Sequence, residues 1–170
     1  MREVEVKILE INTEEVIQKL QKFGAEKTFE GPIEAFYYDF ENKSLSQKDI
    51  VVRLRKRGEL SELAVKEKIS QKKAKIMDEL EVIVSDFNSM YQILHKIGLR
   101  QVKSGKKYRV SYLLSPVHFD IDTIPGIPTF MEIEAPTLDE VKVYVEKLGY
   151  TMNDAKPWSG KDLLRHYKKE

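Results

Sequence analysis

The chain has 170 residues, of which 41% are hydrophobic and 34% charged, a composition typical of a folded globular protein. Its 29 basic and 28 acidic residues leave a net charge of +1, which argues against bulk nucleic-acid binding and against a disordered acidic tail. Cysteine is absent and the 3 histidines show no metal-ligand spacing, so disulfides and thiolate metal sites are excluded. Without a membrane-length apolar run or a secretory signal, we expect one cytoplasmic domain over residues 1–170.

Three times along the chain, a strand with two glutamates two residues apart precedes an amphipathic helix. These units cover residues 3–25, 78–99 and 130–150. Residues that can cap the helices stand at their starts, namely Asn12 or Thr13, Asp86 or Asn88, and the capping-box pair Thr137 and Glu140. Apolar residues recur at helical spacing in each: Val16, Ile17, Leu20 and Phe23; Met90, Ile93, Leu94 and Ile97; Val141, Tyr144, Val145 and Leu148.

The intervening segments alternate polar and apolar residues and are rich in valine, isoleucine and tyrosine, which indicates antiparallel strands. We expect these strands at residues 34–40, 50–58, 61–69, 106–114 and 117–124. A short helix over residues 159–170 is expected to close the chain.

Charged side chains recur at every second position on almost all of the predicted strands, mostly in pairs of the same sign. The ladder consists of Glu3, Glu5 and Lys7; Arg53 and Arg55; Lys66 and Lys68; Glu79 and Glu81; Lys107 and Arg109; Asp120 and Asp122; and Glu132 and Glu134. Each pair alone is compatible with the solvated face of an ordinary antiparallel sheet. The whole set fits that reading poorly, because like charges across neighbouring strands destabilise a sheet.

The three amphipathic helices also need an apolar sheet face to cover. Both requirements are met by an α+β fold in which a closed antiparallel β-sheet of about eight strands turns its charged face inward. The flanking helices would then cover the apolar outer face, and the interior would be a polar tunnel. Paired carboxylates in such a tunnel call for Mg²⁺ or Mn²⁺, and the arginines and lysines call for a polyanion. The chemistry therefore predicts a metal-bound oligophosphate as the ligand.

The motifs in this order resemble those of the CYTH superfamily, the triphosphate tunnel metalloenzymes. The N-terminal "EVEVK" looks like the family's E-x-E-x-K signature, and "RLR", "ELE", "KKYR", "DIDTIPGIPTFMEIE" and "WSGKDLL" follow in the family's order. The resemblance covers essentially the whole chain and implies an eight-stranded antiparallel tunnel. It also implies an activity like those of class IV adenylate cyclases or of thiamine, inorganic or RNA triphosphatases, and the length resembles the small prokaryotic members.

The resemblance and the charge ladder together suggest roles for individual residues. We expect Glu3 and Glu5 to bind the metal, with Glu132 or Glu134 completing the site, and Asp122 to bind the metal or to orient an arginine. The expected phosphate-binding residues are Lys7, Arg53, Arg55, Lys66, Lys107 and Arg109. Expected catalytic residues are Glu79, Glu81 and Lys66, where the two glutamates hold a second metal or orient water.

Two departures from the family pattern stand out. Met77 occupies a position where members often carry arginine, with Lys75 as a substitute, and Ala35 replaces an acidic residue. The sequence leaves open whether a triphosphate is cyclised or hydrolysed, and whether that substrate is ATP, another organic triphosphate or inorganic triphosphate. It also leaves open the number of metals and whether the protein is a homodimer. The alternative function is a non-catalytic sensor of nucleotides or polyphosphate.

Overall fold

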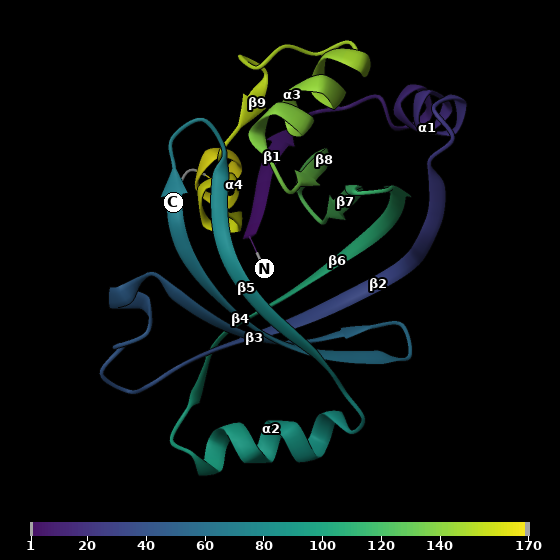
Figure 1. Cartoon of the computed structure of the whole chain (residues 1–170). Coiled ribbons are helices and arrows are strands. Elements are labelled where there is room, and N and C mark those ends of the chain that lie inside the picture. The colour runs from purple at the N-terminus through teal and green to yellow at the C-terminus, as the bar shows by residue number, and fades with distance from the viewer. Residues whose placement is uncertain (1, 169–170) are drawn as a thin grey trace.

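The computed structural model describes residues 2–168, which form nine strands and four α-helices (Figure 1). The strands are β1 (Arg2–Ile8), β2 (Glu26–Asp39), β3 (Ile50–Arg57), β4 (Leu60–Gln71), β5 (Lys75–Val84), β6 (Arg100–Leu114), β7 (Val117–Ile124), β8 (Ile127–Ala135) and β9 (Ala155–Lys156). The helices are α1 (Thr13–Lys22), α2 (Phe87–Lys96), α3 (Leu138–Lys147) and α4 (Gly160–Lys168), with a single 3₁₀ turn, η1 (Ser46–Lys48). None of the helices within the described range is long and apolar enough to span a membrane.

The strands form one antiparallel sheet in the order β5-β4-β3-β2-β6-β7-β8-β1-β9, and β1 also pairs with β5. That pairing closes β1 to β8 into a barrel, and β9 adds a short extra strand beside β1. The predicted α+β class and the closed eight-stranded antiparallel barrel are therefore confirmed.

The barrel does not close along the full length of every strand. β1 pairs with β5 only over residues 75–78, and β7 pairs with β6 only over residues 108–114. Within the described chain, the later part of β5 therefore has a sheet neighbour only in β4, and the first half of β6 only in β2. Among residues 2–168, the stretches 80–84 and 100–107 therefore each pair with a strand on one side only, beside the barrel interior.

The helices start where their capping residues predict. Asn12 accepts a hydrogen bond from the backbone of Glu15, which fixes the first turn of α1. Asp86 caps α2 in the same way, and Thr137 with Glu140 forms the predicted capping box of α3.

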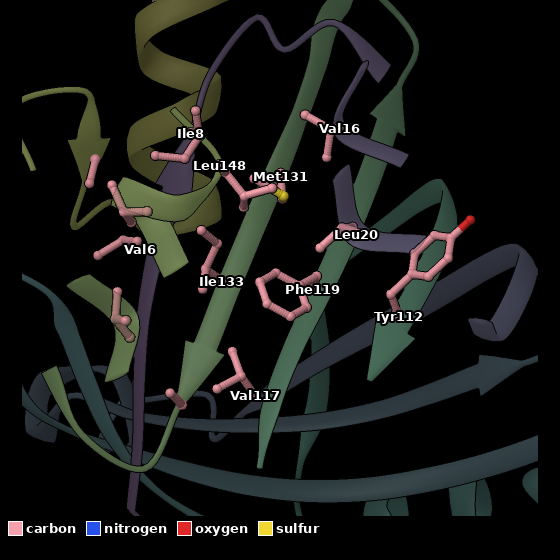
Figure 2. Close-up of a cluster of buried hydrophobic side chains, with 14 of the residues drawn as sticks. Val6, Ile8, Val16, Leu20, Tyr112, Val117, Phe119, Met131, Ile133 and Leu148 are labelled. Atoms are coloured by element: carbon pink, nitrogen blue, oxygen red, sulfur yellow. The ribbon is translucent and has the colours of Figure 1, made fainter. Parts of the chain in front are cut away.

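The larger core cluster lies outside the barrel, between the strands and the helices α1 and α3 (Figure 2). Successive side chains of a strand point to opposite faces, so Val6 and Ile8 of β1 enter this core while the charged residues beside them face inward. From the helices, Val16, Leu20 and Leu148 pack against Phe119 and its neighbours (Figure 2). The predicted arrangement of an apolar exterior under helices and a charged interior is confirmed.

Helix α2 covers a second, smaller cluster on the opposite side of the molecule from α1 and α3 (Figure 1). Leu94 is buried there and Met90 is partly buried, as predicted. The prediction was wrong for Ile93 and Ile97, whose exposed fractions are 49% and 61%. The α2 residues that pack in this cluster are instead Phe87, Met90 and Leu94, because the helix turns that row of side chains toward the sheet.

Two strands are longer than predicted. β2 begins at Glu26 rather than near residue 34, and β6 begins at Arg100 rather than near residue 106. Gly31 and Pro32 interrupt the polar–apolar pattern of the first strand, but both stay paired in register with β6, at Arg109 and Tyr108. A register shift follows only between Lys27 and Phe29. The final helix was predicted over residues 159–170, of which 169 and 170 lie outside the described residues.

Candidate active site

The inward-facing side chains of the barrel enclose a cavity of about 680 Å³, a size suited to a small ligand. Nearly all the residues that the sequence singled out line this cavity: Glu3, Glu5, Lys7, Arg53, Arg55, Lys66, Glu79, Glu81, Lys107, Arg109, Glu132 and Glu134. Asp122 is the exception among them, because its side chain is fully buried in the wall behind the cavity. Folding thus gathers into one chamber the charges that are spread over the whole sequence.

β1 and β8 are hydrogen-bonded neighbours, and carboxylates from both strands lie on their inward face. The register sets Glu5 opposite Glu134 and Lys7 opposite Glu132. The ammonium group of Lys7 lies 2.8 Å from an oxygen of Glu5 and 2.8 Å from an oxygen of Glu132. This buried lysine therefore links the acidic residues of β1 and β8. Burial alone would raise the pKa of Glu5, but the positive charges of Lys7 and Lys75 lower it to about 2.

Glu3 and Glu134 behave differently, because they have fewer positive neighbours. Burial raises the pKa of Glu3 to about 8, helped by its hydrogen bond to Glu79 and by the charge of Glu134, although Lys66 lies 3.0 Å away. Burial likewise raises the pKa of Glu134 to about 7, with Glu5, Asp120 and Glu132 adding to the increase. The negative charge at this part of the cavity therefore exceeds what the nearby lysines neutralise.

Arg109 is fixed by a bidentate ion pair with the buried Asp122, whose two oxygens accept bonds of 2.6 Å from Nε and Nη2. It also contacts Asp120 and Glu132, and these carboxylates hold its pKa above the usual range although burial works against the charge. Lys107 donates a 2.6 Å hydrogen bond to Asp122 as well. Both oxygens of Asp122 are thus used by cations, which favours the orienting role over the metal-ligand role that the sequence also allowed.

The two arginines of β3 form ion pairs with glutamates of β4 and β5. Glu81 accepts bonds of 3.0 Å from Arg53 and 3.2 Å from Arg55, and Arg55 also contacts Glu62. The Nε atom of Arg53 is buried and has no hydrogen-bond acceptor within the described residues. A buried donor without a partner is costly, so this atom is suited to an acceptor that a ligand brings.

Six basic or acidic residues that line the cavity were not assigned a role from sequence: Arg57, Lys75, Lys103, Lys106, His118 and Asp120. Glu62 does not line the cavity but pairs with Arg55. Asp120 belongs to the period-two ladder without an assigned role, and Arg57 extends the ladder by one step beyond Arg55, so the alternation could have found both. Lys75 was considered only as a substitute for a missing arginine, and its ammonium group does reach Glu5, at 3.2 Å. Met77, at the arginine position itself, is buried, and Lys68 pairs with Asp49 at 2.6 Å.

The cavity's acidic residues suit a hard divalent cation, since all of its carboxylate ligands are oxygens. Glu3 and Glu134 are the best suited, because they are crowded, incompletely neutralised and raised in pKa. Within residues 2–168, no three acidic or histidine side chains are grouped closely enough to form a ready-made metal site. A cation would therefore take over carboxylate oxygens that Lys66 and Lys7 now contact.

Three comparisons connect this geometry to known proteins. A family model described as "CYTH domain" matches residues 1–155. A protein of Methanocaldococcus jannaschii named "Putative adenylate cyclase" is 28% identical over 142 residues, which cover 82% of this chain and 79% of that protein.

Solved structures show the same fold. A Pyrococcus horikoshii protein superposes with a TM-score of 0.78 at 24% identity, covering 95% of this chain and 98% of its own. A Vibrio parahaemolyticus protein described as a "putative adenylate cyclase" superposes with a TM-score of 0.84 at 18% identity, covering 95% of this chain and 97% of its own. A Hippeastrum protein described as having a dominant triphosphatase activity gives 0.63 at 11% identity, with 96% and 95% covered. Because the family model spans most of the barrel and its inward-facing charges, the chain belongs to the CYTH domain family.

Proposed function

We propose that this protein is a divalent-metal-dependent enzyme that acts on the triphosphate group of a small molecule inside the barrel, with Mg²⁺ or Mn²⁺ as the cofactor. The main support for this proposal is the buried Nε of Arg53, a hydrogen-bond donor that has no acceptor within the described residues and lies in a cavity lined by further cations. A phosphate oxygen would satisfy it. The names of the relatives, which cite adenylate cyclase and triphosphatase activity, support the same class of substrate.

The phosphate clamp of this proposal consists of Lys7, Arg53, Arg55, Lys66, Lys107 and Arg109. Their charges neutralise the equatorial phosphate oxygens, on which negative charge is spread in the transition state. Most of these groups are held by carboxylates before the ligand arrives, so they are already oriented and little reorganisation accompanies the reaction. Asp122 acts through Arg109 and Lys107 by fixing their positions.

Glu3, Glu5 and Glu134 would hold the cation, with Glu132 beside them. When bound, the ion supplies Lewis-acid polarisation of the phosphate oxygens. Glu79 has a lowered pKa despite its burial, because Glu3 and Lys66 donate hydrogen bonds to it and Lys66 and Arg53 add their charges. It is therefore ionised at neutral pH and can accept a hydrogen bond from the attacking hydroxyl or water, with Glu81 beside it.

Two reactions are compatible with this arrangement. In hydrolysis, a water oxygen attacks the terminal phosphorus, the bridging bond breaks, and the diphosphate leaves. In cyclisation, the ribose 3′ oxygen attacks the α-phosphorus and pyrophosphate leaves. Both use the same clamp and differ only in which phosphorus lies in line with the nucleophile, so products must decide between them.

The test is incubation of the purified protein with ATP or inorganic triphosphate, with Mg²⁺, with Mn²⁺ and with excess chelator. We expect turnover with at least one of the ions and none with chelator, while the melting temperature shows that the chelated protein stays folded. Cyclic AMP with pyrophosphate identifies a cyclase, and ADP or diphosphate with phosphate identifies a triphosphatase. Tight binding of ATP without either product would replace this proposal by the sensor function.

A matched pair of variants tests the metal ligands. Glu5→Gln keeps the shape and removes a charge from the cavity, so we expect turnover to fall at least about tenfold. Glu26→Gln makes the same change at an exposed position of β2 and should leave turnover unchanged. Equal turnover of the two variants would remove Glu5 from the metal site.

A further inference from the structure

Among residues 2–168, the two stretches of the sheet that pair on one side only differ in composition. The first, the β6 edge (residues 100–107), has a register with β2 that shifts between Tyr37 and Tyr38. Its cations are Arg100, Lys103, Lys106 and Lys107. Charged side chains and irregular pairing keep an open edge from joining another chain, so the β6 edge is protected against association.

The second stretch, the β5 edge (residues 80–84, LEVIV), has neither kind of protection. Its register with β4 is unbroken over residues 77–84. The exposed fractions are 72%, 57% and 65% for Leu80, Val82 and Ile83. The single charged residue, Glu81, lines the cavity, where two arginines of β3 bind it. A regular, exposed and apolar edge of this kind is a template for pairing with another strand.

The apolar character of the β5 edge continues on the outer face of the sheet. Strand alternation turns Leu80 and Val82 outward, and Val65 of β4 lies opposite Leu80 with an exposed fraction of 39%. Of β5, only Val84 belongs to the cluster under α2, while α1 and α3 cover the larger core cluster on the other side of the molecule (Figure 1). An exposed apolar strip therefore lies next to an open edge, as is typical of an interaction surface.

We propose that the β5 edge pairs with the β5 edge of a second copy of this chain, in antiparallel orientation about a twofold axis at Val82. Leu80 of one copy then lies opposite Val84 of the other, Glu81 lies opposite Ile83, and the two Val82 residues face each other. The two sheets become continuous through this contact. The interface goes beyond the proposed catalytic function and does not depend on it.

The charge and length of the β5 edge select this register. An axis at Glu81 would set two carboxylates directly opposite each other, which destabilises a sheet. An axis at Ile83 would place Leu80 opposite a residue beyond the edge. An axis at Val82 pairs all of residues 80–84 and brings the exposed Leu80 and Val82 of both copies together on the outer face, where their apolar surface leaves water.

The competing arrangement pairs the β5 edge of one copy with the β6 edge of another. Its attraction would be between Glu81 and the lysines of the β6 edge, but Glu81 already accepts bonds of 3.0 Å from Arg53 and 3.2 Å from Arg55. That contact is also head-to-tail, so it generates a ring or an open chain of copies, whereas the twofold contact closes at two. The two arrangements make different predictions for substitution.

The first experiment measures the mass of the full chain by sedimentation equilibrium from about 1 μM to 1 mM, where a contact of one strand pair is expected to dissociate. We expect a monomer–dimer equilibrium in this range. Val82→Lys sets two ammonium groups opposite each other at the axis, so it should raise the dissociation constant at least about tenfold. Two controls should leave the constant unchanged: Val143→Lys, at an exposed position of α3, and Val102→Lys, at an exposed position of the β6 edge.

The second experiment uses the absence of cysteine from the chain to test the register directly. Residues directly opposite in an antiparallel pair have Cβ atoms about 4.5–5.5 Å apart, close to the spacing that a disulfide requires. Val82→Cys should therefore form a covalent dimer with an added oxidant, while Val143→Cys and Val102→Cys should not. When Val82→Cys and Val102→Cys copies are mixed, only the Val82→Cys dimer should appear.

The melting temperature of each variant shows whether it is folded. A monomer at every concentration would overturn the proposal, and so would a dimer that Val82→Lys leaves intact. Cross-linking between Val82→Cys and Val102→Cys copies would replace the twofold contact by the head-to-tail one. If Val82→Lys did not fold, the uncharged Val82→Cys would decide through its cross-link. Neither readout involves turnover, so failure of the proposed function leaves both tests unchanged.

Discussion

At the residue scale, the cations of the cavity are held by carboxylates, and a ligand must exchange with them. Lys7 bridges Glu5 and Glu132 with two contacts of 2.8 Å, and Arg109 is pinned by Asp122. Such buried pairs are expensive to desolvate and strongly destabilising when one partner is removed. The site therefore combines two kinds of cation: those fixed by fully buried acids, and those such as Arg53 that retain a free donor for substrate.

The geometry of Arg55 gives the first prediction. Its planar group spans Glu62 and Glu81, so Arg55→Lys keeps the charge but loses the fork that reaches two acceptors. We expect triphosphate turnover to fall by about two orders of magnitude, comparable to the loss of one oriented donor to a developing charge. Arg100→Lys, the same change at an exposed position of β6, should keep wild-type turnover. Full activity of Arg55→Lys would show that this side chain does not contact the phosphates.

The raised pKa of Glu3 gives a prediction for stability without ligand. Its pKa rises from 4.5 to about 8 on folding because of burial and of the hydrogen bond to Glu79, so between these values the folded state binds more protons than the unfolded state. The free energy of unfolding therefore decreases as pH rises through that window. Glu134, with a folded pKa of about 7, acts in the same direction. Chemical denaturation at about pH 5 and about pH 8 should show the decrease.

Glu3→Gln tests the origin of that decrease. Glutamine keeps a donor toward Glu79 at every pH, so the variant should lose less stability between the two pH values than wild type does. Glu14→Gln, exposed on α1, should keep the wild-type dependence. A rise in stability toward alkaline pH in the ligand-free protein would contradict the assignment.

Nearly all the charged residues that the period-two alternation singled out line the cavity, because in a strand this alternation fixes which side chains share a face. It could not predict which of these charges pair, since the register between strands far apart in sequence decides that. Lys75 illustrates the limit: it reaches Glu5 only because β1 closes the barrel against β5.

At the element scale, α2 is a helix whose position was predicted from sequence but whose buried face was not. The helical spacing grouped Ile93 and Ile97 with Leu94, but the burial of each depends on the width of the surface beneath the helix. That surface includes Tyr38 of β2, Val52 and Leu54 of β3, and Val84 at the end of β5. The capping residues, by contrast, contact backbone groups within one turn of the helix, so the sequence alone predicted the helix starts.

Substitutions on α2 test this orientation. Leu94→Ala should lower the free energy of unfolding by about 2–5 kcal/mol, because it leaves a cavity in a buried cluster. Ile93→Ala, one residue away and 49% exposed, should change it by less than about 1 kcal/mol. Denaturant unfolding of both variants measures the difference. Equal losses would mean that α2 is rotated on the sheet.

At the scale of the whole molecule, the ligand is part of the stability of the fold. The barrel interior crowds acidic residues whose repulsion the proposed divalent cation would offset, and its lysines and arginines would bind the proposed triphosphate. Binding to the folded state alone adds about 2.7 kcal/mol at a hundredfold excess over the dissociation constant. For a chain of this size, that corresponds to an increase in melting temperature of about 5–10 °C.

Thermal unfolding with and without inorganic triphosphate and Mg²⁺ or Mn²⁺ checks this expectation. Monophosphate at the same concentration serves as the control and should give a much smaller shift, since it contacts only part of the clamp. The absence of any shift with inorganic triphosphate or ATP at millimolar concentration would be evidence against a phosphate site in the barrel.

The barrel closes through its first strand, and this has a consequence for how the protein is made. β1 is made before the strands it pairs with, yet its most extensive pairing is with β8, at residues 127–135, and its pairing with β5 spans only four residues. Glu3 and Glu5 are therefore made long before Glu132 and Glu134, the acidic residues of β8 on the opposite strand. Contacts so distant in sequence slow folding. A nascent chain that stops short of β8 lacks Glu132 and Glu134, so the proposed metal and triphosphate would be bound only after β8 has been made.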